Sequence, residues 1–341
     1  MINELILKGI VLRPHKAYKN SDFTSKAVHV SDKWDYVESW LRNHTSNRAL
    51  TFWIQAKSFK DANNKVDRLS QPLTSYYCIL NMVKALLISK GVDLPQVINH
   101  GLTGKSEGIK NLLTNEYVIL KNSGVLSQLC YYFDETIGDN EQISIDDLLY
   151  NLPFIHRAYC ISNGTRRDKE LFIPVVSPRF YKIEKPVSRK NSYFCGELTD
   201  SWSATQSTIN KIPDSFELVP DTEKTIRFKD RFEWSGRAHA PKVKKLELYN
   251  KKLRNKIFYI HGCTDRIYLK RNNISGVVNH NNIVISFAIL HRLSELCRYN
   301  PESFNAHYRN RYNWLLDEFL KRVLEQMVDE ISAEITGQEI N

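Results

Sequence analysis

Apolar residues recur at helical spacing through the first part of the chain. The segments DKWDYVESWLRN (32–43) and ALTFWIQAKSFKDANNKV (49–66) place apolar side chains three or four positions apart, the period of an amphipathic helix. The same pattern predicts a third helix that begins after Ser70, where Pro72 suits the first turn, and ends before Gly91. We therefore expect three helices before residue 91.

The third predicted helix carries a lysine on its apolar side. At about 100° per residue, Lys84 falls on the same face as Tyr76 and Tyr77. Either the lysine stem covers apolar surface and the charge reaches solvent or an internal acid, or Lys84 binds a phosphate or carboxylate in a pocket lined by the two tyrosines. Beyond the helix, His100 and Gly101 either form a turn with glycine at positive φ or place an imidazole near that pocket.

The pattern changes after about residue 160. Short runs rich in aromatic and β-branched residues, separated by Pro, Gly, Asn or Asp, predict strands. These runs are LFIPVV (171–176), RFYKI (179–183), SFELV (215–219), TIRFKDRFEW (225–234) and DRIYLKR (265–271). From residue 283 helical spacing returns, in IVISFAILHRLSELCRY and then in one longer helix, FNAHYRNRYNWLLDEFLKRVLEQMVDEI.

The order of helices, strands and helices predicts an α+β, mainly helical fold. We expect an N-terminal helical part of the core over residues 1–160 and a β-rich insertion over residues 161–240. In the last part, residues 241–341, a basic helix, a short strand and the C-terminal helices would pack back on the core. Two separate domains with a boundary near residue 161 are the alternative.

Composition is that of an ordinary globular protein. The chain has 341 residues, 42% hydrophobic and 25% charged, and no stretch approaches the roughly 18 continuous apolar residues of a membrane span. Its six cysteines lie far apart without a CxxC pair, and no signal peptide is evident, so we expect reduced thiols and a cytoplasmic location. The sequence holds no HExxH, no GxSxG and no complete P-loop, so we expect neither a bound metal nor a cofactor.

Positive charge is concentrated in one window. Residues 224–271 contain 15 Lys or Arg against 4 Asp or Glu, in a chain whose net charge is +10. Aromatic residues alternate with these cations, which suits phosphate neutralisation combined with stacking on bases. We expect nucleic acid as one partner of this window, with the attracting charge on Lys244, Lys245, Lys251 and Lys252. A solvated surface or a patch for an acidic protein is the alternative.

Three blocks of the chain resemble the YaaC-like family of bacterial cytosolic proteins. They are PLTSYYCILNMVKALLISKG with NHGLTG, then NEYVILKNSGVLSQL with SIDDLLYNLP, and finally SFAILHRLSELCRYNPESF with WLLDEFL. The resemblance covers both ends and much of the middle of the chain. In the last block Arg298 ends a helix before Pro301, where it either caps carbonyl groups or reaches a ligand together with Lys84 and His100.

The helical parts also resemble HEPN-type bundles, many of which are metal-independent ribonucleases with an Arg and a His separated by roughly four to six residues on one helix. The resemblance implies that the arginine holds the phosphate and the histidine acts as general acid or base. Arg254 and His261 fit this spacing, and Asn255 matches the polar residue that often follows the arginine. A helix from Pro241 to His261, stopped by Gly262, would place both side chains within about 20° of each other. There are two alternatives. The last part of this segment forms a strand, or Arg254 is simply part of a basic helix and His261 bonds the last carbonyl groups of that helix.

Three functions follow as hypotheses. The first is metal-independent RNA cleavage by Arg254, His261 and Asn255, with a role in phage defence by analogy to HEPN relatives. The second is a non-catalytic protein that binds nucleic acid or a phosphorylated ligand. The third is an interaction subunit whose C-terminal helices dock a partner or a second copy through the stripe of Tyr308, Tyr312, Leu315, Phe319, Val323 and Met327.

Overall fold

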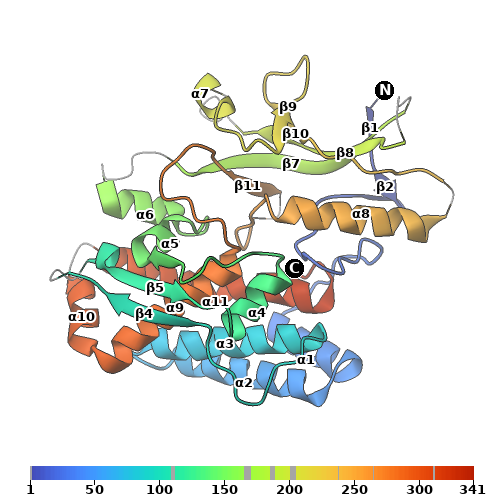
Figure 1. Ribbon diagram of the computed structural model, residues 1–341. Helices are drawn as coiled ribbons and strands as arrows, with labels where there is room; N and C mark the ends of the chain where they lie inside the picture. The colour runs from blue at the N-terminus through green and yellow to red at the C-terminus, as the bar shows by residue number, and fades with distance from the viewer. Residues whose placement is uncertain are drawn as a thin grey trace. The chain divides into compact units, whose positions relative to one another are not determined.

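The computed structural model describes residues 2–108, 112–164, 170–184, 189–199, 205–236, 238–263, 265–309 and 312–341. The fold is α+β, as the hydrophobic pattern predicts. The chain divides into two compact units, whose elements are labelled in Figure 1. The sheet unit contains residues 1–29, 170–275 and 337–341, and the helical unit contains residues 30–169 and 276–336.

The helical unit contains the predicted helices with small shifts at their ends. In α3, Ser70 is the N-cap, Pro72 lies in the first turn and Gly91 follows the last turn with a φ of +77°, all as predicted. The helices are α1 (Lys33–His44), α2 (Asn47–Asn63), α3 (Gln71–Ser89), α4 (Val125–Tyr132), α5 (Ile145–Tyr150), α6 (His156–Asn163), α9 (Asn282–Tyr299), α10 (Pro301–Arg309) and α11 (Asn313–Thr336). A short antiparallel sheet accompanies them, in which β5 (Glu116–Leu120) pairs with both β4 (Leu102–Ser106) and β6 (Gln142–Ser144).

The predicted long C-terminal helix is wrong, because it is divided into α10 and α11. Asn310 and Arg311, between the two, lie outside the described residues. The apolar stripe along these helices is core: Tyr308, Tyr312, Leu315, Phe319, Val323 and Met327 are all buried. Buried side chains offer no docking surface, so this stripe is not the partner site that the third hypothesis requires.

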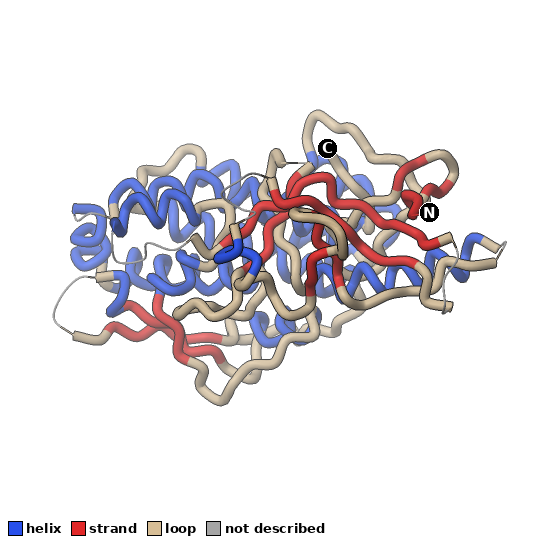
Figure 2. The backbone as a smooth tube through the Cα atoms, turned by 90° about the horizontal axis from the view of Figure 1, so that it is seen from above, coloured by secondary structure: helices blue, strands red, loops and turns tan. Residues whose placement is uncertain are grey.

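The sheet unit is built on a six-stranded antiparallel sheet in the order β1-β7-β8-β10-β9, with β11 also paired to β7. Figure 2 shows the strands in red. The two predicted runs LFIPVV and RFYKI form one strand, β7, which has a register shift between Val176 and Arg179. Such a shift is a β-bulge, which bends a strand without ending it. The strands are β1 (Ile2–Glu4), β7 (Phe172–Ile183), β8 (Ser192–Leu198), β9 (Phe216–Leu218), β10 (Thr225–Phe228) and β11 (Arg266–Lys270), beside a separate pair, β2 (Ile6–Leu7) and β3 (Ile10–Val11). A short helix, α7 (Gln206–Ile209), precedes β9.

The basic helix α8 (His239–Arg254) ends at Arg254, so the predicted helix to His261 is wrong. After the helix the chain is extended: Phe258 exchanges two backbone hydrogen bonds of 2.9 Å with Tyr268 of β11. Ile257 and Tyr259 on either side are buried, so the apolar residues here follow the period of a strand rather than that of a helix.

The division of the chain also differs from the predicted ranges 1–160, 161–240 and 241–341. Val243, Leu246 and Leu253 on α8 belong to one hydrophobic core with the strands, so the basic helix covers the sheet instead of joining the C-terminal helices. The N-terminal residues join the sheet unit as well, because β1 pairs with β7. Strands of two or three residues, such as β1, β2 and β3, are too short to produce a recognisable pattern.

Two simpler expectations can be compared with the structure. All six cysteines are free, as predicted. Among the described residues no helix has the length and hydropathy needed to cross a membrane.

Candidate functional site

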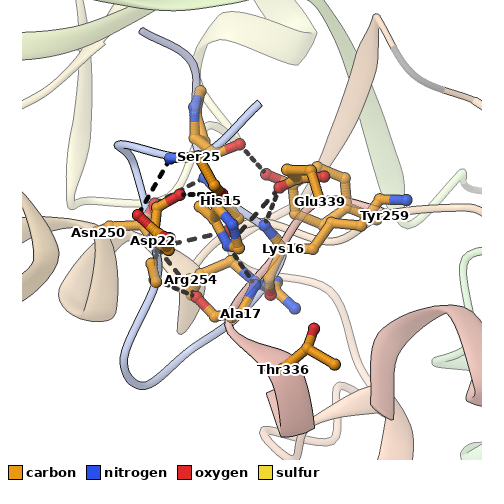
Figure 3. A network of polar contacts seen from close by, with 12 residues as sticks. His15, Lys16, Ala17, Asp22, Ser25, Asn250, Arg254, Tyr259, Thr336 and Glu339 are labelled. Atoms are coloured by element: carbon orange, nitrogen blue, oxygen red, sulfur yellow. Dashed lines mark hydrogen bonds and ion pairs between the residues drawn. The ribbon is translucent and has the colours of Figure 1, made fainter. Parts of the chain in front are cut away.

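Arg254, the predicted phosphate ligand, is part of the internal framework of the sheet unit (Figure 3). Only 5% of its surface is exposed. Its Nε donates to the carbonyl oxygen of Lys16 at 2.6 Å and its Nη1 to that of Ile257 at 2.9 Å. The guanidinium carbon also lies 4.9 Å from the ring centroid of Tyr259. These contacts attach the end of α8 to the N-terminal segment and leave the arginine buried, away from solvent phosphate.

The same network holds the N-terminal segment around His15. Asn250 on α8 accepts a hydrogen bond from the His15 backbone N–H at 2.9 Å and donates to the carbonyl oxygen of Ala17 at 3.1 Å. The Nδ1 atom of His15 accepts the N–H of Ala17 at 2.9 Å. Burial lowers the pKa of this imidazole, which stays neutral at pH 7. Figure 3 shows these groups gathered around His15, with Arg254 beside them.

The other two predicted catalytic residues lie outside this network. His261 is an exposed residue in a turn after the strand-like segment, and Asn255 is the exposed C-cap of α8, where its Nδ2 lies 3.3 Å from the hydroxyl of Tyr18. Because Arg254 and His261 do not share a helix, the alignment within about 20° on which the pairing rests is absent.

The predicted lysines of the basic window are exposed or half-buried, and each has a partner. Lys244, Lys245 and Lys252 lie 3.1, 2.6 and 3.2 Å from Glu247, Glu233 and Asp230, in that order, and the Nζ of Lys251 is 5.3 Å from the ring centroid of Tyr18. Exposed pairs of this kind are weak and easily exchanged for a phosphate. Lys252 and Asn255 also line an open hollow of about 460 Å³ with Lys229 and Lys256.

In the helical unit, by contrast, several predicted ligand-binding residues come together. The hydroxyl of Tyr76 on α3 is hydrogen-bonded to Nδ1 of His100 at 2.5 Å. His291 on α9 lies against both, with ring centroids 5.2 Å from Tyr76 and 5.5 Å from His100. We call the set of Tyr76, Lys84, His100, His291, Glu295 and Arg298 the His100 cluster.

The turn that carries His100 is fixed by the start of α4. Gly101 has a φ of +86°, as in the turn that was one of the two alternatives for this segment, and a Cβ there would lie 3.0 Å from the backbone nitrogen of Leu126. The N–H groups of Val125 and Leu126 donate to the carbonyl oxygens of Asn99 and His100 at 3.0 and 3.1 Å. A glycine is therefore required beside His100, since any side chain would push the turn away from α4.

Burial and neighbouring cations keep both imidazoles neutral. Burial lowers the pKa of His291 to about 3, with further lowering by His100, Arg298 and Arg292. Burial, Lys84 and Arg298 also lower the pKa of His100. The hydroxyl of Tyr76 has a raised pKa because it is buried, so it remains protonated. The cluster thus offers neutral hydrogen-bonding groups surrounded by positive charge.

The cations of the cluster are more accessible than its rings. Arg298, near the end of α9, is exposed, and Lys84 on α3 is half-buried with its Nζ 5.2 Å from the Phe52 ring centroid. Burial and Arg48 lower the pKa of Lys84. Tyr77, predicted to line the same pocket, stacks on Phe59 at 5.3 Å between centroids and also lies 5.5 Å from the ring centroid of Tyr76. Lys84 and Arg298 therefore both act electrostatically on His100, and Tyr77 lies between Tyr76 and Phe59 of α2.

A buried ion-pair network centred on Arg292 is connected to the cluster through Glu295. Arg292 on α9 donates from Nη2 to Glu116 at 2.7 Å and to Ser106 at 2.6 Å, and its Nη1 donates to Glu295 at 3.1 Å. Glu295 also lies 3.8 Å from Nδ1 of His291. A Cβ on Gly104 of β4 would lie 1.9 Å from the Glu295 carboxylate, so glycine allows α9 to approach the small sheet this closely.

The sequence analysis missed Glu295 and also a second cluster residue, His291. It lies seven positions before Arg298, so both project from a similar side of α9, and Glu295 lies between them at i+4. That spacing is the reverse of the Arg-to-His order expected from the HEPN resemblance. The contact of His291 with Tyr76 joins residues that are far apart in the chain, and no local pattern indicates it.

Comparison with known proteins gives one match. A family model described as YaaC-like Protein matches residues 15–335, almost the whole chain. No curated protein and no solved structure matches. The matched range includes the His100 cluster and the Arg254 network.

Proposed function

The chain belongs to the YaaC-like protein family, and we propose that its helical unit binds the phosphate group of a nucleotide or an RNA at the His100 cluster. The observation that carries this proposal is the contact of two neutral histidines and a tyrosine hydroxyl beside Lys84 and Arg298. Neutral donors beside fixed positive charges are the groups that recognise a phosphate.

The residues of the cluster have different roles in this proposal. Arg298 is exposed and can donate two hydrogen bonds to phosphate oxygens, and Lys84 adds a second positive charge. The hydrogen bond to Tyr76 occupies Nδ1 of His100, so Nε2 is left for the ligand. Nε2 donates to a phosphate oxygen in one tautomer and accepts a proton in the other.

A second candidate function is metal-independent cleavage of RNA at the same cluster. It is favoured by the lowered pKa of His100, because a neutral imidazole can accept a proton from a ribose 2′-hydroxyl. In this candidate the helical unit is HEPN-like, and His100 replaces His261 as the base while Arg298 replaces Arg254 as the phosphate ligand. A role in phage defence is an extension of the same candidate by analogy.

Binding is tested with a fluorescein-labelled single-stranded RNA, with inorganic phosphate as competitor. Arg298→Met should weaken RNA binding by about tenfold or more, because a charge-assisted hydrogen bond contributes about 1.5–3 kcal/mol. Arg322→Met is the matched control, since Arg322 is an exposed arginine on α11. Equal affinities of wild type and Arg298→Met would contradict the proposal.

The basic window is tested in the same assay. Replacing Lys244, Lys245, Lys251 and Lys252 together with Gln removes four positive charges from the sheet unit. If the window only attracts RNA, this variant should bind more weakly at low salt and should differ less from wild type at high salt. A loss larger than that of Arg298→Met would place the main phosphate contacts in the window instead.

Cleavage is tested by incubating the protein with mixed single-stranded RNA in EDTA. His100→Ala should abolish cleavage, and His261→Ala should retain it. The reverse result would restore His261 as the catalytic residue. An intact RNA with the wild-type protein would exclude the second candidate and leave binding as the proposed function.

A further inference from the structure

A separate group of metal-ligating side chains lies at the other end of α4. We propose that Cys130, Glu135 and His280 form a site for a divalent transition-metal ion, with Zn²⁺ as the best fit. One ligand atom from each residue lies within 4.8 Å of the other two. This inference is independent of the phosphate proposal, since none of the three residues belongs to the His100 cluster.

The end of α4 holds two of the ligands in a fixed relation. Cys130 is in the last turn of α4, and its carbonyl oxygen accepts the N–H of Phe133 at 3.0 Å and of Glu135 at 2.9 Å. Asp134, between those two donors, has a φ of +57°, which turns the chain back after the helix. The thiol and the Glu135 carboxylate are thereby placed on the same side of the helix end.

The third ligand comes from the start of α9. His280 precedes Asn281, the N-cap of this helix, and the backbone N–H of Asn281 donates to Oε1 of Glu135 at 2.7 Å. The other carboxylate oxygen of Glu135 lies 2.8 Å from Nδ1 of His280. This bidentate contact fixes the orientation of both the carboxylate and the imidazole.

A second carboxylate, that of Glu141, lies next to the other ring nitrogen of His280. Oε1 of Glu141 is 3.3 Å from Nε2 of His280. In protein zinc sites the nitrogen that does not bind metal usually donates its hydrogen to a carboxylate, which fixes the tautomer. With Nε2 donating to Glu141, Nδ1 presents its lone pair towards Cys130 and Glu135.

The chemistry of the donors points to zinc. One thiolate sulfur, one imidazole nitrogen and one carboxylate oxygen form a mixed set that suits Zn²⁺ and excludes Mg²⁺ or Ca²⁺, which prefer oxygen ligands. Cys130 and His280 are buried, while the side chains of Glu135 and Glu141 are 15% and 33% exposed, so the carboxylate side faces the solvent. Tetrahedral metal bonds of about 2.0–2.3 Å place the ligand atoms roughly 3.3–3.7 Å apart, so Nδ1 of His280 and the Glu135 oxygen, now 2.8 Å apart, would separate slightly as the ion enters.

The site would join the end of α4 to the start of α9. These helices also carry residues that hold or form the His100 cluster, so a bound metal would stabilise the scaffold of that cluster without touching it. Without a metal, His280 forms ion pairs with the two carboxylates, Glu135 and Glu141. The test must therefore distinguish a metal site from this ion pair.

The experiment uses Co²⁺ as a spectroscopic probe for Zn²⁺. The full chain is stripped with a chelator, and Co²⁺ is added while the thiolate-to-cobalt charge-transfer absorption is recorded. We expect one equivalent of Co²⁺ per chain to produce this band and Zn²⁺ to abolish it. We also expect Zn²⁺ to raise the thermal unfolding midpoint, because a ligand that binds only the folded state stabilises it.

Variants assign the band to individual residues. Cys130→Ser should remove it, and Cys297→Ser, which changes a half-buried thiol elsewhere in the helical unit, should retain it. Glu141→Gln should keep the band but weaken cobalt binding by about 10–100-fold, the usual effect of losing such a carboxylate. Circular dichroism of the metal-free variants establishes that Cys130→Ser is folded. A wild-type protein without the band, or an unchanged band in folded Cys130→Ser, would overturn the proposal.

Discussion

The Arg254 network and the His100 cluster contain similar residues and differ in how these are exposed. Each combines an arginine, a histidine and a tyrosine. Arg254 is 5% exposed and donates to two backbone carbonyl groups, whereas Arg298 is exposed at the end of α9. The first set holds one part of the chain to another, and the second presents charge to solvent. Residue types and spacing alone do not separate a framework from a site, because the difference lies in burial and in the partners.

The comparison also shows where glycine matters. Gly101 and Gly104 bring His100 and Arg292 close to neighbouring backbone in the helical unit. In the Arg254 network the backbone is held instead by the Asn250 side chain, which accepts a hydrogen bond from the His15 N–H and donates one to the Ala17 carbonyl oxygen. The sheet unit thus uses its polar groups to hold its own backbone, whereas Arg298 of the helical unit is exposed.

The largest expected effect on stability concerns the support of the His100 cluster. Arg292→Met should lower the free energy of unfolding by about 3–5 kcal/mol, because the buried Glu116 carboxylate loses its guanidinium partner and keeps only Ser106 and His307. Urea unfolding followed by circular dichroism measures this loss. Arg322→Met, which breaks an exposed pair with Glu318, should change stability by less than about 0.5 kcal/mol. Equal effects of both variants would mean that burial of the Arg292 pair has no consequence.

The direct comparison of the two arginines comes next. Arg254→Met should lower the free energy of unfolding by about 2–3 kcal/mol, since two carbonyl groups lose their donors. Arg298→Met should change it by less than about 0.5 kcal/mol while weakening RNA binding. The same urea titration serves both variants. The distinction between framework and site fails if Arg298→Met is the more destabilising of the two.

A dependence on pH is expected from His291. Its folded-state pKa of about 3 is lowered from the ordinary value near 6.5, so the stability it contributes is present above pH 6.5 and is lost as the pH falls towards 3. Between pH 7 and pH 5 the loss attributable to this group is about 2 kcal/mol. Unfolding free energies at both pH values, compared between wild type and His291→Gln, isolate it from the contribution of His15. A slope unchanged by the substitution would show that His291 is not held neutral by burial.

The smallest effect on stability is expected at His261 and Asn255, the two residues that the sequence analysis groups with Arg254 as catalytic. His261→Ala and Asn255→Ala should each change the free energy of unfolding by less than about 0.5 kcal/mol, because both side chains are exposed. The thermal midpoint should stay within a few degrees of wild type. A loss above 1 kcal/mol at His261 would indicate that the turn is part of the sheet-unit framework.

The parts of the fold and of the site that could be predicted from the sequence are those that depend on residues close together in the chain. The limits of α3 and the positive φ of Gly101 depend on neighbours within a few residues, and the local pattern indicated both. The end of α8 was mispredicted because Ile257 and Tyr259 continue an apolar helical face and also fit a strand. Pairing of Phe258 with Tyr268 in β11 decided in favour of the strand.

The sequence by itself determined the YaaC-like family, the α+β class, most helices of the helical unit and four of the six residues of the His100 cluster, Tyr76, Lys84, His100 and Arg298. Only the tertiary structure decided that His291 completes that cluster, that Arg254 is buried, and that Cys130 and His280 meet. The physical reason is distance along the chain. Helix and turn formation depend on neighbouring residues, while burial and contacts between remote segments depend on how whole elements pack.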